Sequence, residues 1–186
     1  MMNLNDWFNK GMTIETYNKS LDKLKEGASR VYNEFTLPND EGFFQELADK
    51  NLRVIALAEP WCGHCMFNLP VLFRLAEKVN MPVRILARDE NLELMDQYLT
   101  NGKSRSIPIF IFIDEQGNEV AKWGPIATFT KAFVDQHKET LPSKDAEDYN
   151  EKFKEVIKFI TKSFMNDSNY WNASYGEMKQ TLENVK

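Results

Sequence analysis

Apolar residues recur along the chain at spacings that outline its helices and strands. From Ile14 to Phe35 they stand three or four positions apart, which predicts one long amphipathic helix. We expect this stripe to pack on the rest of the domain, although its three repeats would also suit a dimerising coiled coil. Asp40 can cap a second helix. The apolar residues of that helix are Phe43, Phe44, Leu47 and Ala48.

Shorter apolar runs alternate with helical patterns in the middle of the chain. The run from Leu52 to Ala58 predicts a strand covered on both faces, and a helix is expected from Met66 to Val79. Further strands are expected at residues 82–87, 109–113 and 120–123, with a helix at 92–99. The turn at 114–118 contains Gly117 and Asn118, which tolerate a positive φ, so the last two strands form an antiparallel hairpin.

The last third of the chain has a helical pattern. Helices are expected at residues 127–137 and 146–164, separated by Pro142. The second of these carries an apolar stripe of Tyr149, Phe153, Val156, Ile160 and Phe164. The polar stretch from Asn166 to Lys186 predicts a weak helix or an ordered tail.

Charge and composition narrow the possible partners and location. The 186 residues carry a net charge of -5 without a basic cluster, so binding to nucleic acid or an anionic membrane is not expected. The longest apolar stretch, residues 107–113, is too short to span a bilayer. Residues 1–11 lack the basic start and apolar run of a secretory signal, so we expect a cytosolic protein.

Cys62 and Cys65 are the only cysteines, and they stand three positions apart. Such a pair closes too small a loop for a structural disulfide and in a reducing compartment indicates redox chemistry or metal binding. If a helix begins here, its unpaired amides and dipole stabilise a Cys62 thiolate, which is the form that attacks a disulfide. Cys65, one turn further in, would resolve the mixed disulfide.

The neighbours of the cysteines can tune this chemistry. A partly cationic His64 would stabilise the Cys62 thiolate and make the pair more oxidising. Trp61 offers a flat apolar surface to a substrate or simply packs against the domain.

The segment Trp61-Cys62-Gly63-His64-Cys65 resembles the W-C-G-x-C centre of the thioredoxin superfamily, with the dipeptide typical of protein disulfide isomerases. Pro70, five residues beyond Cys65, matches the helix-kinking proline of that family. The segment 105–108 resembles the one that ends in its cis-proline, and Gly124 matches the glycine that leaves room in its substrate groove. The resemblance covers approximately residues 43–137.

This resemblance implies an α/β fold with a central mixed sheet, flanked by helices and extended by helices at both ends. The implied organisation is an N-terminal helical extension at residues 1–38, a thioredoxin-like domain at 39–140, and a C-terminal helical extension at 141–186 that packs on the domain. Pro108 would be cis and face the cysteines, and the Ile107 backbone would pair with an extended substrate. Gly124 would line the same groove.

The sequence departs from the family pattern beneath the cysteines. Ala56 stands where the family usually carries a buried acid, and Ile85 stands where a partnering lysine is common. Glu59 could accept the proton of Cys65, but it could equally be an exposed surface carboxylate.

The resemblance implies a thiol-disulfide oxidoreductase that acts on protein or small-molecule disulfides and needs no bound cofactor. Its reductant would be a thioredoxin-reductase-like flavoprotein or a low-molecular-weight thiol. A non-catalytic adaptor that uses the groove beside Trp61 and Pro108 is the main alternative. A zinc site is less expected, because only His64 and His137 could join the cysteines as histidine ligands.

Overall fold

A mixed four-stranded sheet forms the centre of the computed structural model, which describes residues 3–185. The strands are β1 (Arg53–Ala58), β2 (Val83–Ala87), β3 (Ile109–Ile113) and β4 (Glu119–Trp123). Their order is β2-β1-β3-β4, with β1 parallel to β2 and antiparallel to β3. β3 and β4 form the predicted antiparallel hairpin. All four strands lie where the apolar runs predicted them.

The two central strands are apolar at almost every position because both of their faces are covered. Every residue of β3 is buried, and in β1 only Arg53 is partly exposed. The edge strand β4 is different, since Trp123 is its only buried residue. This difference explains why β1 and β3 read as continuous apolar runs while β4 is mixed.

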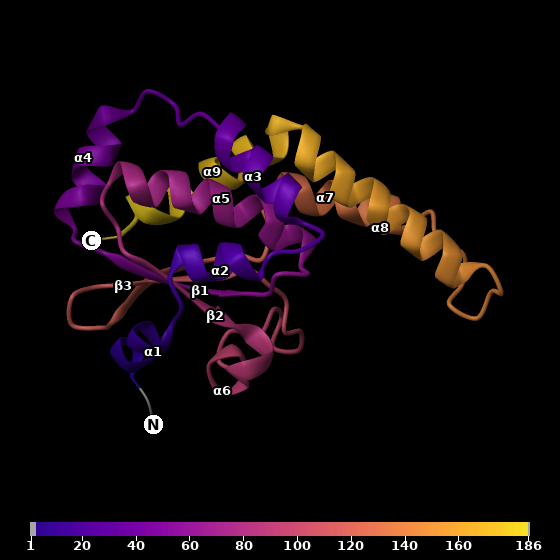
Figure 1. Ribbon diagram of the computed structural model, residues 1–186, viewed down its shortest axis with the longest axis horizontal. Coiled ribbons are helices and arrows are strands. Elements are labelled where there is room, and N and C mark those ends of the chain that lie inside the picture. Colours follow the sequence, from indigo (N-terminus) through magenta and orange to yellow (C-terminus); the bar gives the residue numbers. More distant parts are fainter. Residues whose placement is uncertain (1–2, 186) are drawn as a thin grey trace.

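Helix α5 (Gly63–Lys78) follows β1 directly and lies along the sheet, as Figure 1 shows. It contains Pro70 and packs against α3 (Lys25–Glu34). Asp40 caps α4 (Glu41–Asp49) as predicted, by accepting a hydrogen bond from the Phe43 amide. A short turn, η1 (Arg88–Glu90), follows β2, and α6 (Leu92–Met95) ends earlier than the predicted helix at 92–99. Helix α7 (Thr128–Lys138) agrees with the sequence prediction.

The predicted single helix from Ile14 to Phe35 is wrong, because two helices occupy this segment. They are α2 (Ile14–Ser20) and α3 (Lys25–Glu34), separated by a turn at residues 21–24. Leu21 has an extended backbone (φ -69°, ψ 136°), yet its side chain is buried. The apolar spacing continues through the break because both helices bury their stripes against the same domain, so periodicity alone could not reveal the turn.

The first described residues form a helix that the sequence analysis did not predict. This helix is α1 (Leu4–Lys10), and Asn3 begins it with a capping box that includes Asp6. The chain then reaches Met12, whose amide and carbonyl pair with those of Ile85 at 2.8 and 2.9 Å. Met12 therefore covers the outer edge of β2, which would otherwise offer unpaired backbone groups.

The C-terminal segment forms two long helices, α8 (Tyr149–Asn166) and α9 (Ser168–Glu183). The sequence predicted only a weak helix or tail after Asn166, but α9 is regular and buries Tyr170, Trp171 and Tyr175. The first half of α8 projects away from the sheet (Figure 1), and of its predicted stripe only Ile160 and Phe164 are buried.

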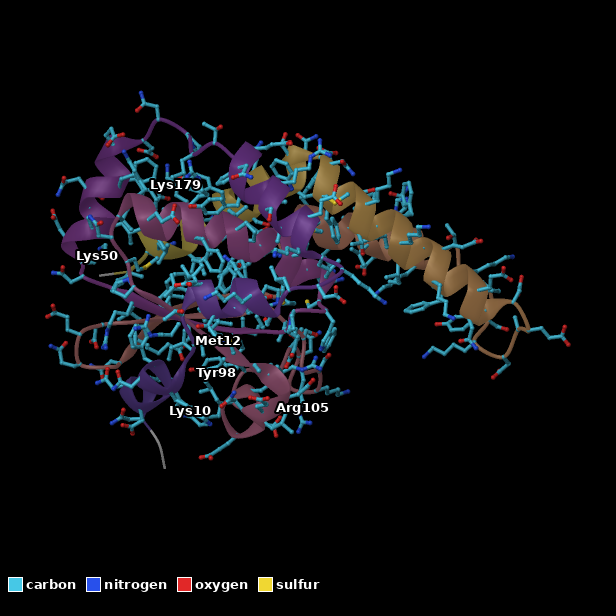
Figure 2. The ribbon with its side chains drawn as sticks, in the orientation of Figure 1. Lys10, Met12, Lys50, Tyr98, Arg105 and Lys179 are labelled. Atoms are coloured by element: carbon cyan, nitrogen blue, oxygen red, sulfur yellow. The ribbon has the colours of Figure 1, made fainter. Side chains whose placement is uncertain are left out.

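Contacts with α4 hold the end of α9 in place. Lys179 of α9 forms an ion pair with Asp40, the capping residue of α4. Lys50, at the other end of α4, donates a hydrogen bond of 2.6 Å to the Val185 carbonyl. Figure 2 labels both lysines. The outermost positions of the two predicted extensions, 1–2 and 186, lie outside the described residues.

Within the described residues, no helix has both the length and the apolarity needed to cross a bilayer.

Candidate functional site

The two cysteines lie where β1 leads into α5, and the helix places them in different positions. Cys62 is the N-cap of α5, and its Sγ accepts a hydrogen bond of 3.2 Å from the Cys65 amide. Cys65 lies one turn into the helix and is fully buried, whereas Cys62 keeps 7% of its surface exposed. A thiolate at Cys62 would thus meet the positive end of the helix dipole and a free backbone donor.

The pKa values of the two thiols shift in opposite directions. The pKa of Cys62 is lowered, chiefly by a hydrogen bond from the Cys65 side chain and further by the amides of Cys65 and His64. The pKa of Cys65 is raised well above its ordinary value, chiefly by burial and also by Cys62 and the charge of Glu59. Cys62 is therefore the thiol that ionises first and the one that solvent can reach.

The loop before β3 faces Cys62. The Cys62 thiol lies 3.6 Å from the Ile107 carbonyl oxygen, to which it can donate. The Ile107–Pro108 peptide bond is cis, and so is Gly124–Pro125, which no feature of the sequence had suggested. Gly124 has φ +129°, and a Cβ there would lie 2.2 Å from the Pro108 carbonyl oxygen. Only glycine fits this close approach of two backbones.

His64 is neutral near pH 7, so the predicted partly cationic imidazole is wrong. The ring packs against Phe164 of α8, with centroids 5.7 Å apart. Burial, together with the charge of Lys138, lowers the pKa of His64 to about 4. The sequence could not show this, because the covering residues come from α7 and α8, far along the chain. His64 cannot supply the cationic stabilisation of the thiolate that was expected from its position.

Trp61 and Gly63 flank Cys62 on the chain and face different surroundings. Trp61 is 59% exposed, and the Arg88 guanidinium lies 5.0 Å from the centre of its ring. Gly63 faces α8, where a Cβ would lie 3.2 Å from the Thr161 Oγ1. One side of the reactive thiol is therefore an open aromatic surface, and the other is closed by the C-terminal helices.

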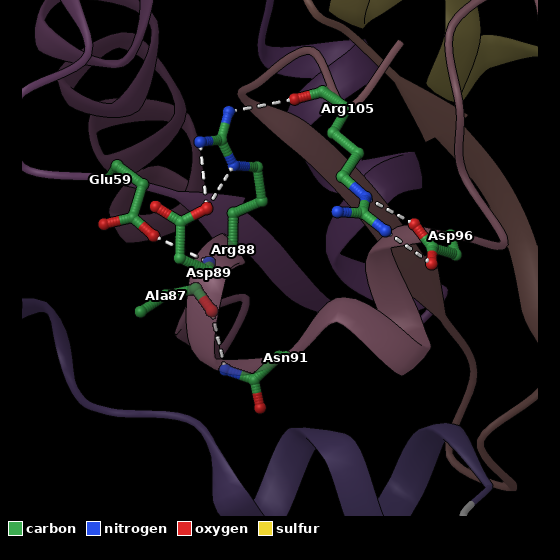
Figure 3. A network of polar contacts seen from close by, with 7 residues as sticks. All are labelled: Glu59, Ala87, Arg88, Asp89, Asn91, Asp96 and Arg105. Carbon is green, nitrogen blue, oxygen red and sulfur yellow. Dashed lines mark hydrogen bonds and ion pairs between the residues drawn. The ribbon is translucent and has the colours of Figure 1, made fainter. Parts of the chain in front are cut away.

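Glu59 is buried, which corrects the view that it is an exposed surface carboxylate. Its Oε1 accepts a hydrogen bond of 2.9 Å from the Asp89 amide at the start of the turn after β2. Figure 3 shows this contact within a polar network in which Arg88 pairs with Asp89 and donates to the Arg105 carbonyl. The network joins the loop after β1 to the segment that precedes Pro108.

The positions beneath the cysteines are apolar. Ala56 and Ile85 are direct neighbours in the pairing of β1 with β2, and both are fully buried. The nearby polar residue is Tyr17 of α2, which is buried and donates a hydrogen bond of 3.2 Å to the Glu59 carbonyl. Burial raises the pKa of Tyr17, and both cysteines add to this effect. Sequence reasoning assigned Tyr17 only to an apolar stripe and missed its place beside the site.

A buried polar link connects α5 to α9. Asn68 donates a hydrogen bond of 2.9 Å to the His64 carbonyl and one of 3.5 Å to the Pro125 carbonyl. Ser174 of α9 donates to the Asn68 Oδ1 at 2.5 Å. Neither residue had been singled out from the sequence, because their contact joins positions 106 residues apart. In the described part of the chain, His, Cys, Asp and Glu residues form no group of three or more that could hold a metal ion.

Comparisons with known proteins support the family assignment. A family model described as thioredoxin matches residues 11–140. A Pseudomonas aeruginosa protein of unknown function has a similar structure, with a TM-score of 0.70, 16% identity and full coverage of both chains. The crystal structure of an HIV epitope-scaffold gives a TM-score of 0.69 and 13% identity, also over both full chains. No curated protein matches the sequence significantly. The family model covers well over half of the chain and includes the C-x-x-C pair, so the chain belongs to the thioredoxin family.

Proposed function

We propose that this protein is a thiol-disulfide oxidoreductase with Cys62 as nucleophile and Cys65 as resolving cysteine. The observation that carries the proposal is the contrast between the two thiols. Cys62 is the more exposed and has a lowered pKa, while Cys65 is buried and has a raised pKa. This contrast suits a pair in which one sulfur attacks a substrate and the other waits until the mixed disulfide has formed.

The reaction consists of two exchange steps. The Cys62 thiolate attacks one sulfur of a substrate disulfide, forms a mixed disulfide and releases the other substrate sulfur as a thiolate. Cys65 then loses its proton and attacks the Cys62 sulfur, which forms the Cys62–Cys65 disulfide and releases the second substrate thiolate. Two electrons pass to the substrate in all, and the protons released when Cys62 and Cys65 ionise balance those taken up when the two substrate thiolates become thiols. The same steps in reverse would oxidise a substrate dithiol.

Substrate would lie over the groove between Cys62 and the loop before β3. The Ile107 backbone would pair with an extended substrate segment, and Pro108 would keep that segment beside the thiol. Gly124 would leave the space that a side chain would close. Trp61 would contribute the exposed apolar surface at the edge of this groove.

The pair must be reduced again after each turnover. In the cytosolic setting that we propose, the electrons would come from a flavoprotein that resembles thioredoxin reductase or from a low-molecular-weight thiol. Protein disulfides and small-molecule disulfides are both candidate substrates.

A turnover assay tests the proposal. The native chain should reduce insulin or a small aromatic disulfide in the presence of a dithiol reductant, and Cys62→Ser should abolish this activity. Cys65→Ser should instead retain substrates from a cell extract as mixed disulfides through Cys62. Equal rates for the native chain and Cys62→Ser would exclude the enzymatic role and favour the adaptor.

A further inference from the structure

A pocket lies against the turn that separates α2 from α3 and includes Pro60 and Trp61, the two residues that precede Cys62. Its lining residues are Ser20, Asp22, Lys23, Leu24, Pro60 and Trp61. Its volume is about 360 Å³, near the lower end of the range of pockets that hold small ligands. Four of the six lining residues come from the N-terminal helices, which lie outside the segment 43–137 that carries the motifs of the thioredoxin superfamily. The pocket is therefore formed largely by residues that carry none of these motifs, although the thioredoxin family model, at residues 11–140, includes them.

The walls of the pocket are apolar and its charges balance. Leu24, Pro60 and Trp61 contribute hydrophobic surface, and Leu24 is only partly buried by the rest of the core. Asp22 and Lys23 are exposed and carry opposite charges. Such a lining attracts neither an anion nor a cation strongly. An apolar group would bind there favourably, because the pocket removes it from water.

The pocket wall formed by Trp61 is held in position. The Arg88 guanidinium lies 5.0 Å from the centre of the indole, within the range of a cation–π contact. Arg88 in turn pairs with Asp89 and donates a hydrogen bond of 3.1 Å to the Arg105 carbonyl (Figure 3). A wall that is already fixed costs less ordering when a ligand binds.

The distance from the thiol suits a side chain of the substrate. Pro60 and Trp61 immediately precede Cys62, and neighbouring Cα atoms lie about 3.8 Å apart. An extended substrate rises about 3.3 Å per residue. A residue one to three positions from the substrate cysteine can therefore place its side chain in the pocket while the two sulfurs react.

We propose that this pocket is a specificity subsite for a large apolar side chain close to the reactive cysteine of a polypeptide substrate. The inference rests on the proposed thiol-disulfide activity and names the substrate class: extended polypeptides with Leu or Phe near the disulfide. The contact with the thiol keeps that side chain at a high local concentration, so a small apolar pocket is enough to discriminate between substrates.

Short peptides that carry one cysteine as a disulfide with thionitrobenzoate provide the probe. Gly, Leu or Phe is placed on either side of that cysteine. Reduced protein attacks the peptide sulfur through Cys62 and releases coloured thionitrobenzoate, and Cys65 then frees the peptide thiol. We expect the second-order rate constant of this single turnover for the better-placed Leu or Phe peptide to exceed that for the Gly peptide about tenfold.

Filling the pocket should remove this preference. Leu24→Trp places a larger side chain within the pocket, and Ser20→Trp adds bulk from its exposed rim if the first variant fails to fold. In either variant the ratio between the Phe and Gly peptides should fall to about one. Leu37→Trp is the matched control, because Leu37 lies in the linker between α3 and α4 and does not line the pocket. This control should keep the preference.

The outcomes separate the subsite from the activity. Equal rates for the Gly, Leu and Phe peptides, with release that still depends on Cys62, would overturn the subsite and leave the proposed function intact. A preference that survives in Leu24→Trp and Ser20→Trp would likewise overturn it. If no release depends on Cys62, the proposed function fails and the subsite fails with it.

Discussion

Cys62 and Cys65 are three residues apart, but their surroundings lower the pKa of Cys62 and raise that of Cys65. At the start of α5, the Cys62 Sγ accepts a hydrogen bond from the Cys65 amide. Cys65 is enclosed by apolar residues, which penalise its charged form. The functional asymmetry of the pair therefore originates in one helical turn.

The reactivity of Cys62 should depend on Cys65. The pH midpoint of Cys62 alkylation by iodoacetamide should lie below the ordinary thiol value of about 8.5. Cys65→Ala removes the hydrogen bond that contributes most to the lowered pKa, so the midpoint should rise. Cys65→Ser keeps a donor and should show a smaller rise. Identical midpoints in the native chain and Cys65→Ala would contradict this assignment.

Burial of His64 should make stability depend on pH. Its pKa is about 4 in the folded chain, compared with 6.5 for an unperturbed histidine. As the pH falls, the unfolded chain takes up a proton at His64 before the folded chain does. The folded state is therefore fully stable in this respect above about pH 6.5 and loses stability as the pH falls towards 4. We expect this difference in proton binding at His64 to lower the free energy of unfolding by about 2 kcal/mol between pH 7 and pH 4.5.

Urea unfolding of the native chain and His64→Gln at these two pH values measures this contribution. The variant should lose less stability on acidification than the native chain. His137→Gln, at the second histidine, is the control and should behave like the native chain. An equal loss of stability in the native chain and His64→Gln would show that His64 is protonated normally.

At the level of secondary structure, the reactive thiol lies between an N-terminal turn that the family model includes and a C-terminal helix beyond the end of that model at residue 140. The turn between α2 and α3 forms a pocket with Trp61, and α8 approaches Gly63 on the other side. The loop before β3 and the segment after β4 complete the surroundings of Cys62. The surroundings of Cys62 therefore include elements that are distant from the C-x-x-C segment in the sequence, and we expect these elements to influence specificity.

Gly124 should be essential for the contact between these loops. Gly124→Ala would place a methyl group against the Pro108 carbonyl at a backbone φ of +129°. We expect a loss of about 2 kcal/mol or more in the free energy of unfolding. Gly42→Ala is the matched control, because a Cβ at this helical position meets no atom within 4 Å. Thermal unfolding compares the two variants, and similar melting temperatures would refute the close approach.

On the scale of the whole molecule, the extensions and the sheet share one hydrophobic core. Phe164 of α8 packs against Phe67 of α5 with ring centroids 4.7 Å apart. Met178 and Leu182 of α9 are fully buried. Such continuous packing favours cooperative unfolding of the extensions together with the sheet.

Two phenylalanines of α8 allow a test of this cooperativity. Phe164→Ala should lower the free energy of unfolding by about 3 to 5 kcal/mol and speed amide exchange of Ile111 in β3. Phe153→Ala, on the projecting half of α8, should cost less than about 1 kcal/mol. Unchanged exchange of Ile111 in Phe164→Ala would show that the extension unfolds separately.

The sequence predicted the strands and the position of the two cysteines at a helix start, for local reasons. Strands covered on both faces need apolar residues at consecutive positions, as β1 and β3 have. The arrangement of Cys62 and Cys65 follows from their spacing at a helix start. The break at residues 21–24 was not predictable in this way, because apolar spacing is the same when two helices pack on one core.

The order of residues was enough to predict the strands of the sheet, the family resemblance and the placement of the two cysteines one helical turn apart, because these depend on neighbours within a few residues. The folded chain was needed to see that burial lowers the pKa of His64, that Glu59 is buried and that a pocket adjoins Trp61. Each of these depends on which distant segment covers a side chain. Solvation and electric fields act through space, and the order of residues does not specify them until the chain has folded.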